Sequence, residues 1–175
     1  DFSEKENVIN NIENIEIKEY YIGVDWGFEH YGTLVVIGVD FEDNYYIVEV
    51  IAKQHKYFDY WKMLILQKYK EYQVSRVFCD SARTEYVQGL LDFGINAENA
   101  KKDVKEGIDL VGAMYKRNAL KITEKAFKGK FEDEIYSYVW GKNDEPVKEN
   151  DDVMDAIRYV LYSLKKDEGG IAYLY

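Results

Sequence analysis

"YYIGVDWGFEHYGTLVVIGVD", residues 20–40, is an apolar and β-branched stretch that carries an aspartate, Asp25, near its middle. Aromatic and β-branched residues at 20–26 and 33–40 predict two strands, and the glycines between them predict a turn. A buried carboxylate is costly unless it is paired, hydrogen-bonded or bound to a metal. Asp25 therefore either ends its strand at a turn, as aspartates often do, or holds a cation. The stretch alone leaves both readings open.

The rest of the chain predicts a sheet covered by helices. A third strand is expected at 45–52, and its short connection predicts an antiparallel meander with the first two. A domain of the α/β (α+β) class follows from the later alternation of strands and helices. The expected elements are a helix at 57–72, strands at 76–80 and 119–123, helices at 84–94, 104–118 and 150–164, and a helix with a Tyr-rich strand within 124–140.

Composition indicates one globular domain. The 175 residues are 47% hydrophobic and 16% aromatic, which argues against disorder despite a net charge of −10. No apolar run is long enough to span a bilayer, and the beginning does not look like a signal peptide. The single cysteine, Cys79, excludes an internal disulfide and suits a reducing compartment. We expect a soluble intracellular domain at 20–164, after a polar lead-in or interdomain linker at 1–19 and before a tail at 165–175.

The basic residues are unevenly distributed. An acidic chain is a poor match to nucleic acid, because phosphate binding needs lysine and arginine. Residues 101–130, however, hold nine basic and four acidic side chains, so this segment is +5 while the rest of the chain is −15. The segment is either a track for DNA phosphates, with Lys101, Lys102 and Lys105 as the candidate contacts, or a solvated helix face.

Aspartates end or begin three of the expected apolar elements. Asp25 ends the first strand, Asp80 ends "RVFCD", and "DDVMD" at 151–155 opens the last helix. Helix capping explains one or two of these residues but not all three. Asp152 and Asp155 share a helix face, and carboxylates meeting at the rim of a sheet would repel one another without a divalent cation. Oxygen ligands suit Mg²⁺ or Mn²⁺, and two such ions are the usual device for phosphodiester hydrolysis.

Three motifs resemble those of a known family. "YYIGVDWG" (20–27), "VFCDSA" (77–82) and "NDDVMDAIRYVLYSL" (150–164) resemble, in order and spacing, the three acidic motifs of the nuclease domain of the large terminase subunit, the DNA-packaging motor of tailed bacteriophages. The most specific part is Asp-Ala-hydrophobic-Arg-Tyr at 155–159. "EDEIYSYVWGKNDEPVKEN" (132–150) is similar to the Glu…Tyr-x-Trp strand and loop of that family.

The resemblance implies a ribonuclease H-like mixed sheet, in which antiparallel strands 1–3 are followed by parallel strands and flanked by helices. It also implies a metal-dependent endonuclease that cuts concatemeric double-stranded DNA. Two Mg²⁺ or Mn²⁺ ions are the expected cofactors. Position by position, the motifs give Asp25, Asp80 and Asp155 as catalytic metal ligands and Asp152 as a further metal ligand. The expected role of Arg158, Tyr159, Glu134 and Tyr138 is structural.

The same resemblance implies partners that the chain does not contain. No GxxxxGK[ST] phosphate loop occurs in the 175 residues, so we expect an ATPase domain elsewhere in a longer chain. Double-stranded DNA, the portal and the small terminase subunit are the other expected partners, and no membrane is expected. The expected location is the cytoplasm of the bacterial host, with a transient stay at the procapsid portal.

Two other classes of function remain open from the sequence. A different ribonuclease H-like nuclease, such as a Holliday-junction resolvase or a transposase-type enzyme, would use acidic residues on similar elements. A non-catalytic assembly or DNA-docking module would use the aspartates as caps and the segment 101–130 for binding. An actin-like sugar kinase, suggested by "GVDWG", needs two lobes and a longer chain.

Overall fold

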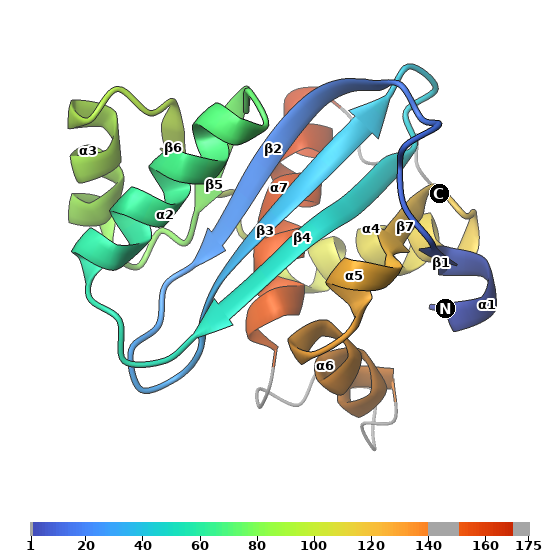
Figure 1. Cartoon of the computed structure of the whole chain (residues 1–175). Helices are drawn as coiled ribbons and strands as arrows, with labels where there is room; N and C mark the ends of the chain where they lie inside the picture. The colour runs from blue at the N-terminus through green and yellow to red at the C-terminus, as the bar shows by residue number, and fades with distance from the viewer. Residues whose placement is uncertain (1, 140–150, 170–175) are drawn as a thin grey trace.

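A seven-stranded mixed sheet forms the centre of the protein (Figure 1). The computed structural model describes residues 2–139 and 151–169. The strand order is β1-β7-β4-β3-β2-β5-β6; β2, β3 and β4 pair antiparallel and all other pairs are parallel. The predicted class, an antiparallel meander followed by parallel strands, is confirmed. The strands are β1 (Val8–Ile9), β2 (Ile17–Asp25), β3 (Gly32–Asp40), β4 (Tyr45–Lys53), β5 (Arg76–Cys79), β6 (Ala97–Asn99) and β7 (Leu120–Thr123).

Helices cover both faces of the sheet. In Figure 1, α2 and α3 lie on one side, while α7 crosses behind β2 and β3 on the other. Within the described ranges, no helix is long and apolar enough to cross a membrane. The helices are α1 (Glu4–Asn7), α2 (Phe58–Glu71), α3 (Thr84–Asp92), α4 (Val104–Lys116), α5 (Glu124–Phe127), α6 (Lys130–Val139) and α7 (Asp152–Asp167).

The prediction of a Tyr-rich strand within 124–140 is wrong for the residues that the structure describes. Residues 124–127 and 130–139 are the helices α5 and α6. Phe131, Glu134 and Ile135 are all buried, and this spacing of three and four residues places them on one helix face. Helical burial therefore outweighed the β propensity of the tyrosines. Residues 140–150, with the rest of the expected strand and loop, lie outside the described part.

Side chains of the central strands alternate between two hydrophobic cores. In β3, Leu34 and Val36 pack with α2 and α3, whereas Val35 and Ile37 pack with α4 to α7. This is the two-residue period of a strand that is covered on both faces. In β2, Tyr21 belongs to the core on the α7 side, and residue 25 is in phase with it. The aspartate that ends β2 therefore faces α7.

Helix α7 lies unusually close to β2, and Gly23 makes this possible. A Cβ atom on residue 23 would stand 2.2 Å from the carbonyl oxygen of Ala156, far inside van der Waals contact. The helix can therefore rest on the strand only where the strand has no side chain. Because Ala156 follows Asp155, this contact sets the position of Asp155 relative to the end of β2.

The polar segment 1–19 contributes to the fold. Strand β1 pairs parallel with β7, and the ring of Phe2 packs edge-on against Tyr115. Asn7 is fully buried and its amide donates to the carbonyl oxygens of Tyr115 and Leu120, at 3.1 and 3.4 Å. The two-residue strand was too short to be recognised from its pattern. The division into a linker at 1–19, a domain at 20–164 and a tail at 165–175 stays a prediction.

Candidate active site at the end of strand β2

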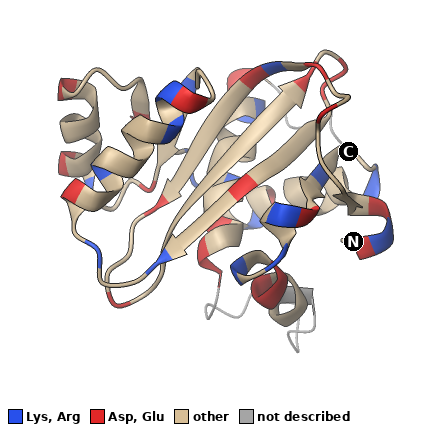
Figure 2. Ribbon diagram, viewed as in Figure 1, with Lys and Arg blue, Asp and Glu red and all other residues tan. Residues whose placement is uncertain are grey.

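Three elements that are distant in the sequence bring acidic residues to one end of the sheet. Asp25 is the last residue of β2, and Asp80 follows β5, the parallel neighbour of β2. The backbone N–H of Asp80 donates to the carbonyl oxygen of Val24 at 2.9 Å, so the two strand ends are tied together. Asp152 and Asp155 lie in the first turn of α7. Figure 2 shows acidic residues at the end of β2 and at the start of α7, on the same side of the molecule.

The carboxylates of this group lie close enough to disturb one another's ionisation. Asp25 is only 7% exposed, and burial, followed by the charges of Asp155, Asp80 and Asp152, raises its pKa well above the usual range. Burial also raises the pKa of Asp155 to about 7, although the Arg158 guanidinium acts in the opposite direction. Like charges that raise each other's pKa are the electrostatic signature of a shared site.

Asp152 belongs to the edge of the same group. Burial, and then the charge of Asp151, raises its pKa, while Lys130 and His30 act to lower it. Its carbonyl oxygen accepts a hydrogen bond from the Thr33 hydroxyl at 2.9 Å, which joins the start of α7 to β3. The charge of Asp152 therefore raises the pKa of Asp25 and of Asp155. Its own carboxylate is also influenced by two basic side chains, Lys130 and His30.

Two residues of the last motif contact the carboxylates directly. Arg158 is nearly buried, and its guanidinium lies 3.0 Å from Oδ1 of Asp155. The Tyr159 hydroxyl donates to Oδ1 of Asp25 at 3.4 Å. The expected structural role of Arg158 and Tyr159 thus takes a specific form: each orients one aspartate of the group.

Lys102 is the member of the predicted lysine set that contacts the acidic group. Its ammonium forms an ion pair with Asp80 and lies 5.6 Å from the centroid of the Tyr159 ring. Lys101 instead pairs with Asp167, near the end of α7, and Lys105 is exposed in the first turn of α4. The basic stripe is therefore not uniform, since one lysine neutralises a carboxylate of the site and another pairs elsewhere.

Glu134 anchors α7 from a neighbouring helix. It is fully buried in α6, and its carboxylate accepts hydrogen bonds from the backbone N–H groups of Val153 at 2.9 Å and Met154 at 3.2 Å. Asp151, the residue at the N-cap position of α7, makes no such side-chain bond. Burial raises the pKa of Glu134 to about 7. Sequence reasoning missed this cap, because the acceptor lies 19 and 20 residues from its two donors and in another element.

The donor set fits a hard divalent cation. Carboxylate oxygens that converge from two strands and a helix are the ligands of Mg²⁺ and Mn²⁺ sites. Within residues 2–139 and 151–169, however, no three His, Cys, Asp or Glu side chains meet closely enough to enclose an ion without adjustment. Lys102 and Arg158 instead neutralise two of the carboxylates.

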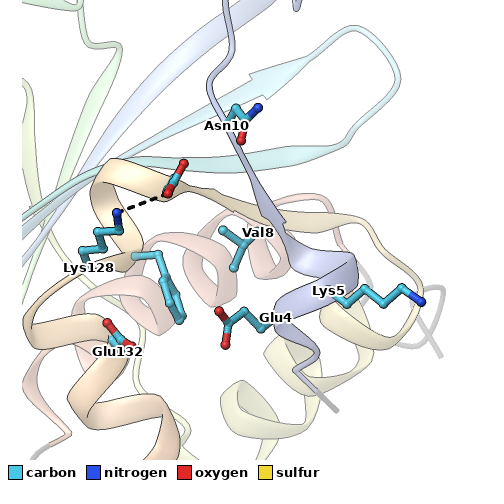
Figure 3. A pocket seen from close by; sticks show the side chains of 8 residues that line it. Glu4, Lys5, Val8, Asn10, Lys128 and Glu132 are labelled. Atoms are coloured by element: carbon cyan, nitrogen blue, oxygen red, sulfur yellow. Dashed lines mark ion pairs between the residues drawn. The ribbon is translucent and has the colours of Figure 1, made fainter.

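Two cavities flank the described part of the fold. One, of about 390 Å³, is lined by aromatic side chains and by Asp80 itself. The other, of about 600 Å³, lies between the N-terminal elements and helices α5 and α6, and charged residues of both signs surround it (Figure 3). In this second cavity Lys128 forms an ion pair with Glu124, and none of the predicted site residues lines it.

Comparison with known proteins finds one family over most of the chain. The family model described as the terminase RNaseH-like domain matches residues 22–164. The large terminase subunit of Escherichia phage T5 is 25% identical over 162 residues, which are 86% of this chain and 36% of the relative. The chain thus spans about a third of the length of that relative.

Solved structures of terminases share the fold. The large terminase of the thermophilic bacteriophage D6E, in complex with ADP, superposes with a TM-score of 0.83 at 22% identity over 93% of this chain and 43% of that one. The P22 large terminase nuclease domain gives 0.72 at 18% identity, over 94% and 90%. The nuclease domain of g2p, the large terminase of bacteriophage SPP1, with bound Mn, gives 0.67 at 18% identity, over 92% and 97%.

The matched segment contains every aspartate of the site. It begins inside β2, one residue before the glycine that admits α7, and ends inside α7. The predicted ribonuclease H-like architecture agrees with the terminase nuclease structures. On this match the chain belongs to the family of ribonuclease H-like domains of the phage large terminase subunit.

Proposed function

We propose that this chain is the metal-dependent endonuclease domain of a viral DNA-packaging terminase, which cuts concatemeric double-stranded DNA by phosphodiester hydrolysis. The observation that carries the proposal is the convergence of Asp25, Asp80 and Asp155 at one end of the sheet. Aspartates that only cap helices or end strands would gain nothing from a fold that brings them together from three separate elements, because their charges repel one another. A site that binds cations benefits from that arrangement.

The proposed ligands are Asp25, Asp80 and Asp155, with Asp152 as a further ligand. Two Mg²⁺ or Mn²⁺ ions would supply activation of the attacking water and stabilisation of the leaving oxygen. The SPP1 relative was solved with bound Mn and a large terminase nuclease from phage G20c with bound zinc, which supports use of a divalent metal here.

Other residues of the chain prepare the ligands. Arg158 holds Asp155 in one orientation, and Tyr159 donates a proton to Asp25 in a hydrogen bond. Lys102 offsets the charge of Asp80, and its ammonium could also contact a DNA phosphate bound beside Asp80. Glu134 fixes the first turn of α7, from which Asp152 and Asp155 project.

The partners follow from the longer relatives. Because the chain spans only part of the large terminases that it resembles, we propose that an ATPase domain of the same longer chain holds and moves the DNA. An acidic nuclease domain then need not bind DNA tightly by itself. The portal and the small terminase subunit are the further proposed partners, and the proposed location is the host cytoplasm.

The test is cleavage of supercoiled plasmid by the 175-residue chain in Mn²⁺, in Mg²⁺ and in EDTA. We expect nicking and linearisation in metal, none in EDTA, and none with Asp80→Ala. Asp59→Ala is the matched control, because this aspartate is 92% exposed in α2 and should cut like wild type. Cutting that persists in EDTA or in folded Asp80→Ala would contradict the proposal.

A non-catalytic docking module is the second candidate, and the spacing of the acidic side chains favours it on one point. Among the described residues no three carboxylates are already arranged around an ion. If wild type does not cut, calorimetry with Mn²⁺ separates the two. Heat that is lost in Asp155→Ala supports a metal site that needs its motor, and a flat trace supports the docking module.

A further inference from the structure

An aromatic cavity adjoins the acidic group. It has a volume of about 390 Å³ and shares one wall, Asp80, with the proposed catalytic site. Six of its other lining residues are aromatic and come from the β2–β3 loop, the first turns of α2 and the start of α3: Trp26, Phe28, Tyr57, Phe58, Trp61 and Tyr86. None of them has a part in the proposed hydrolysis.

The rings on one side of the cavity are packed against one another and held in place. Phe58 and Tyr86 stack with centroids 4.4 Å apart and planes 16° from parallel. Trp26 meets Tyr86 edge-on at 5.1 Å, and its indole N–H donates to the carbonyl oxygen of Asp80 at 3.1 Å. This hydrogen bond fixes the aromatic wall to Asp80, whose side chain belongs to the acidic group.

The rings on the other side are exposed and belong to two loops that are tied together. Phe28 lies 5.0 Å from Tyr57 between ring centroids. The backbone N–H of His55 donates to the carbonyl oxygen of Phe28 at 2.8 Å, which joins the β2–β3 loop to the β4–α2 loop. Figure 1 shows both loops at the same end of the sheet, beside α2. Exposed aromatic rings on such a support form a surface on which a flat ligand can stack.

Cations border the aromatic surface. Lys56 and Arg83 both line the cavity and are exposed. Arg83 lies over the Tyr86 ring at 4.2 Å and pairs with Glu85, while Lys56 lies 5.0 Å from the Tyr60 ring. Aromatic rings next to lysine and arginine are the combination with which proteins hold single-stranded nucleic acid: bases stack and phosphates pair with the cations.

We propose that this cavity is a stacking subsite for an unpaired base of the DNA strand whose phosphate lies at the acidic group. The inference rests on the proposed nuclease function and extends it to the nucleotide next to the scissile bond. Two observations select a nucleobase over an apolar peptide: the cations at the rim, and Asp80, which is common to both sites. A base that has already left its partner stacks here without the cost of unpairing.

The experiment compares two labelled oligonucleotides by fluorescence anisotropy in EDTA, where no cleavage is expected. One is single-stranded octathymidylate, and the other is an octamer of the same backbone without bases. We expect the wild-type chain to bind octathymidylate about tenfold more tightly. Tyr57→Ala and Phe28→Ala should abolish this preference; these rings are 76% and 38% exposed, so the fold should tolerate their loss. Phe41→Ala, which removes a 65% exposed ring at the β3–β4 turn, should keep it.

Equal affinity for the two octamers, no measurable binding of octathymidylate, or a preference that survives both pocket substitutions would overturn the inference. Plasmid cleavage by the same samples tests the nuclease separately. Cleavage without a base preference contradicts only the subsite. A base preference without cleavage, together with a flat Mn²⁺ calorimetric trace, contradicts only the nuclease. In the cleavage assay Tyr57→Ala should raise KM about tenfold with little change in kcat, as expected of a residue that binds the substrate outside the reacting atoms.

Discussion

Gly23 and Ala156 meet more closely than any side chain at position 23 would allow: a Cβ atom there would stand 2.2 Å from the Ala156 carbonyl oxygen. The same contact holds α7 against β2 two residues before Asp25. The distance between Asp25 and Asp155 therefore depends on a residue that has no ionisable group of its own.

Gly23→Ala should separate the helix from the strand. We expect a loss of about 1 to 3 kcal/mol in the free energy of unfolding, because backbone must move to admit the methyl group. Cleavage should fall further, by about a hundredfold, since a misplacement near 1 Å at a reacting centre costs that much. Urea unfolding and plasmid cleavage measure the two effects. Gly38→Ala, which would meet only side-chain atoms at 3.0 Å, should keep most activity, and an active Gly23→Ala would contradict the role.

The four carboxylates should differ in their importance. Asp25→Ala and Asp155→Ala should remove cleavage at every metal concentration, whereas Asp152→Ala should leave a partial activity that recovers at high Mn²⁺. Asp152 differs because its charge acts on Asp25 less than those of Asp155 and Asp80 do, so it lies at the edge of the group and contributes less to holding a cation. Cleavage rates as a function of Mn²⁺ concentration measure this. Wild-type kinetics for Asp152→Ala would assign the residue to capping of α7.

Glu134 should matter for stability more than its distance from the reaction suggests. Glu134→Ala leaves the buried N–H of Val153 and the partly buried N–H of Met154 without their acceptor and should cost about 2 kcal/mol. Glu134→Gln keeps one oxygen acceptor and should cost less. Thermal unfolding measures both, with the exposed Asp133→Ala as control. If Ala and Gln destabilise equally, the hydrogen bonds are not the cause.

Without divalent ions, the domain should be most stable in mild acid. Burial raises the pKa of Asp155 and of Glu134 to about 7, so the folded state keeps protons that the unfolded chain releases. The free energy of unfolding should therefore fall as the pH rises from about 5 to 8. Below pH 4 it should fall again, because ion pairs with Lys101 and Arg76 lower the pKa of Asp167. Melting temperatures in EDTA should drop by several degrees from pH 5 to 8.

The same melting curves test the cause of this pH dependence. Asp155→Asn should reduce the slope between pH 5 and 8, and saturating Mn²⁺ should reduce it in the wild type; the slope that remains belongs to Glu134, which is not a proposed metal ligand. Asp59→Asn should have the wild-type slope, since this side chain is almost fully exposed. A slope that Asp155→Asn and Mn²⁺ both leave unchanged would mean that the acidic group does not govern stability in this range.

The three lysines at 101–105 should separate into different roles. Lys105 is exposed, so Lys105→Ala should reduce the dependence of DNA affinity on log salt by about one unit if it contacts a phosphate. Lys102→Ala removes the partner of Asp80 and should change the metal dependence of cleavage as well. Anisotropy titrations at several salt concentrations measure the slope. An unchanged slope for Lys105→Ala would exclude this residue from the phosphate track.

Much of the frame could be predicted from local pattern. The strands ending at Asp25 and Cys79 and the helix beginning at Asp152 follow from apolar runs and from acids at their ends, which are properties of neighbouring residues. We expected these carboxylates to meet at the rim of a sheet, and the parallel pairing of β2 with β5 brings Asp25 and Asp80 to the same edge. What could not be predicted is contact between distant elements. Lys102 appeared as part of a charge run, and only its placement beside Asp80 gives it a specific role.

The error at α6 has a physical source as well. The tyrosines within residues 132–139 suggest a strand by their β propensity, but the burial of Phe131, Glu134 and Ile135 on one side requires a helix. The aromatic cavity was equally hidden. Trp26, Tyr57 and Tyr86 occur in three separate segments, and each alone reads as an ordinary packing residue.

Tyr159 and Asp25 contact each other across 134 positions of the chain, and every element of the acidic group except α7 precedes residue 101. During synthesis, the strands of the described sheet therefore emerge before the helix that carries Asp152 and Asp155. Docking of α7, which is synthesised after both strands that end at the site, would complete the proposed nuclease site. On the proposed function, a chain truncated before residue 151 lacks Asp152 and Asp155 and should not cut DNA.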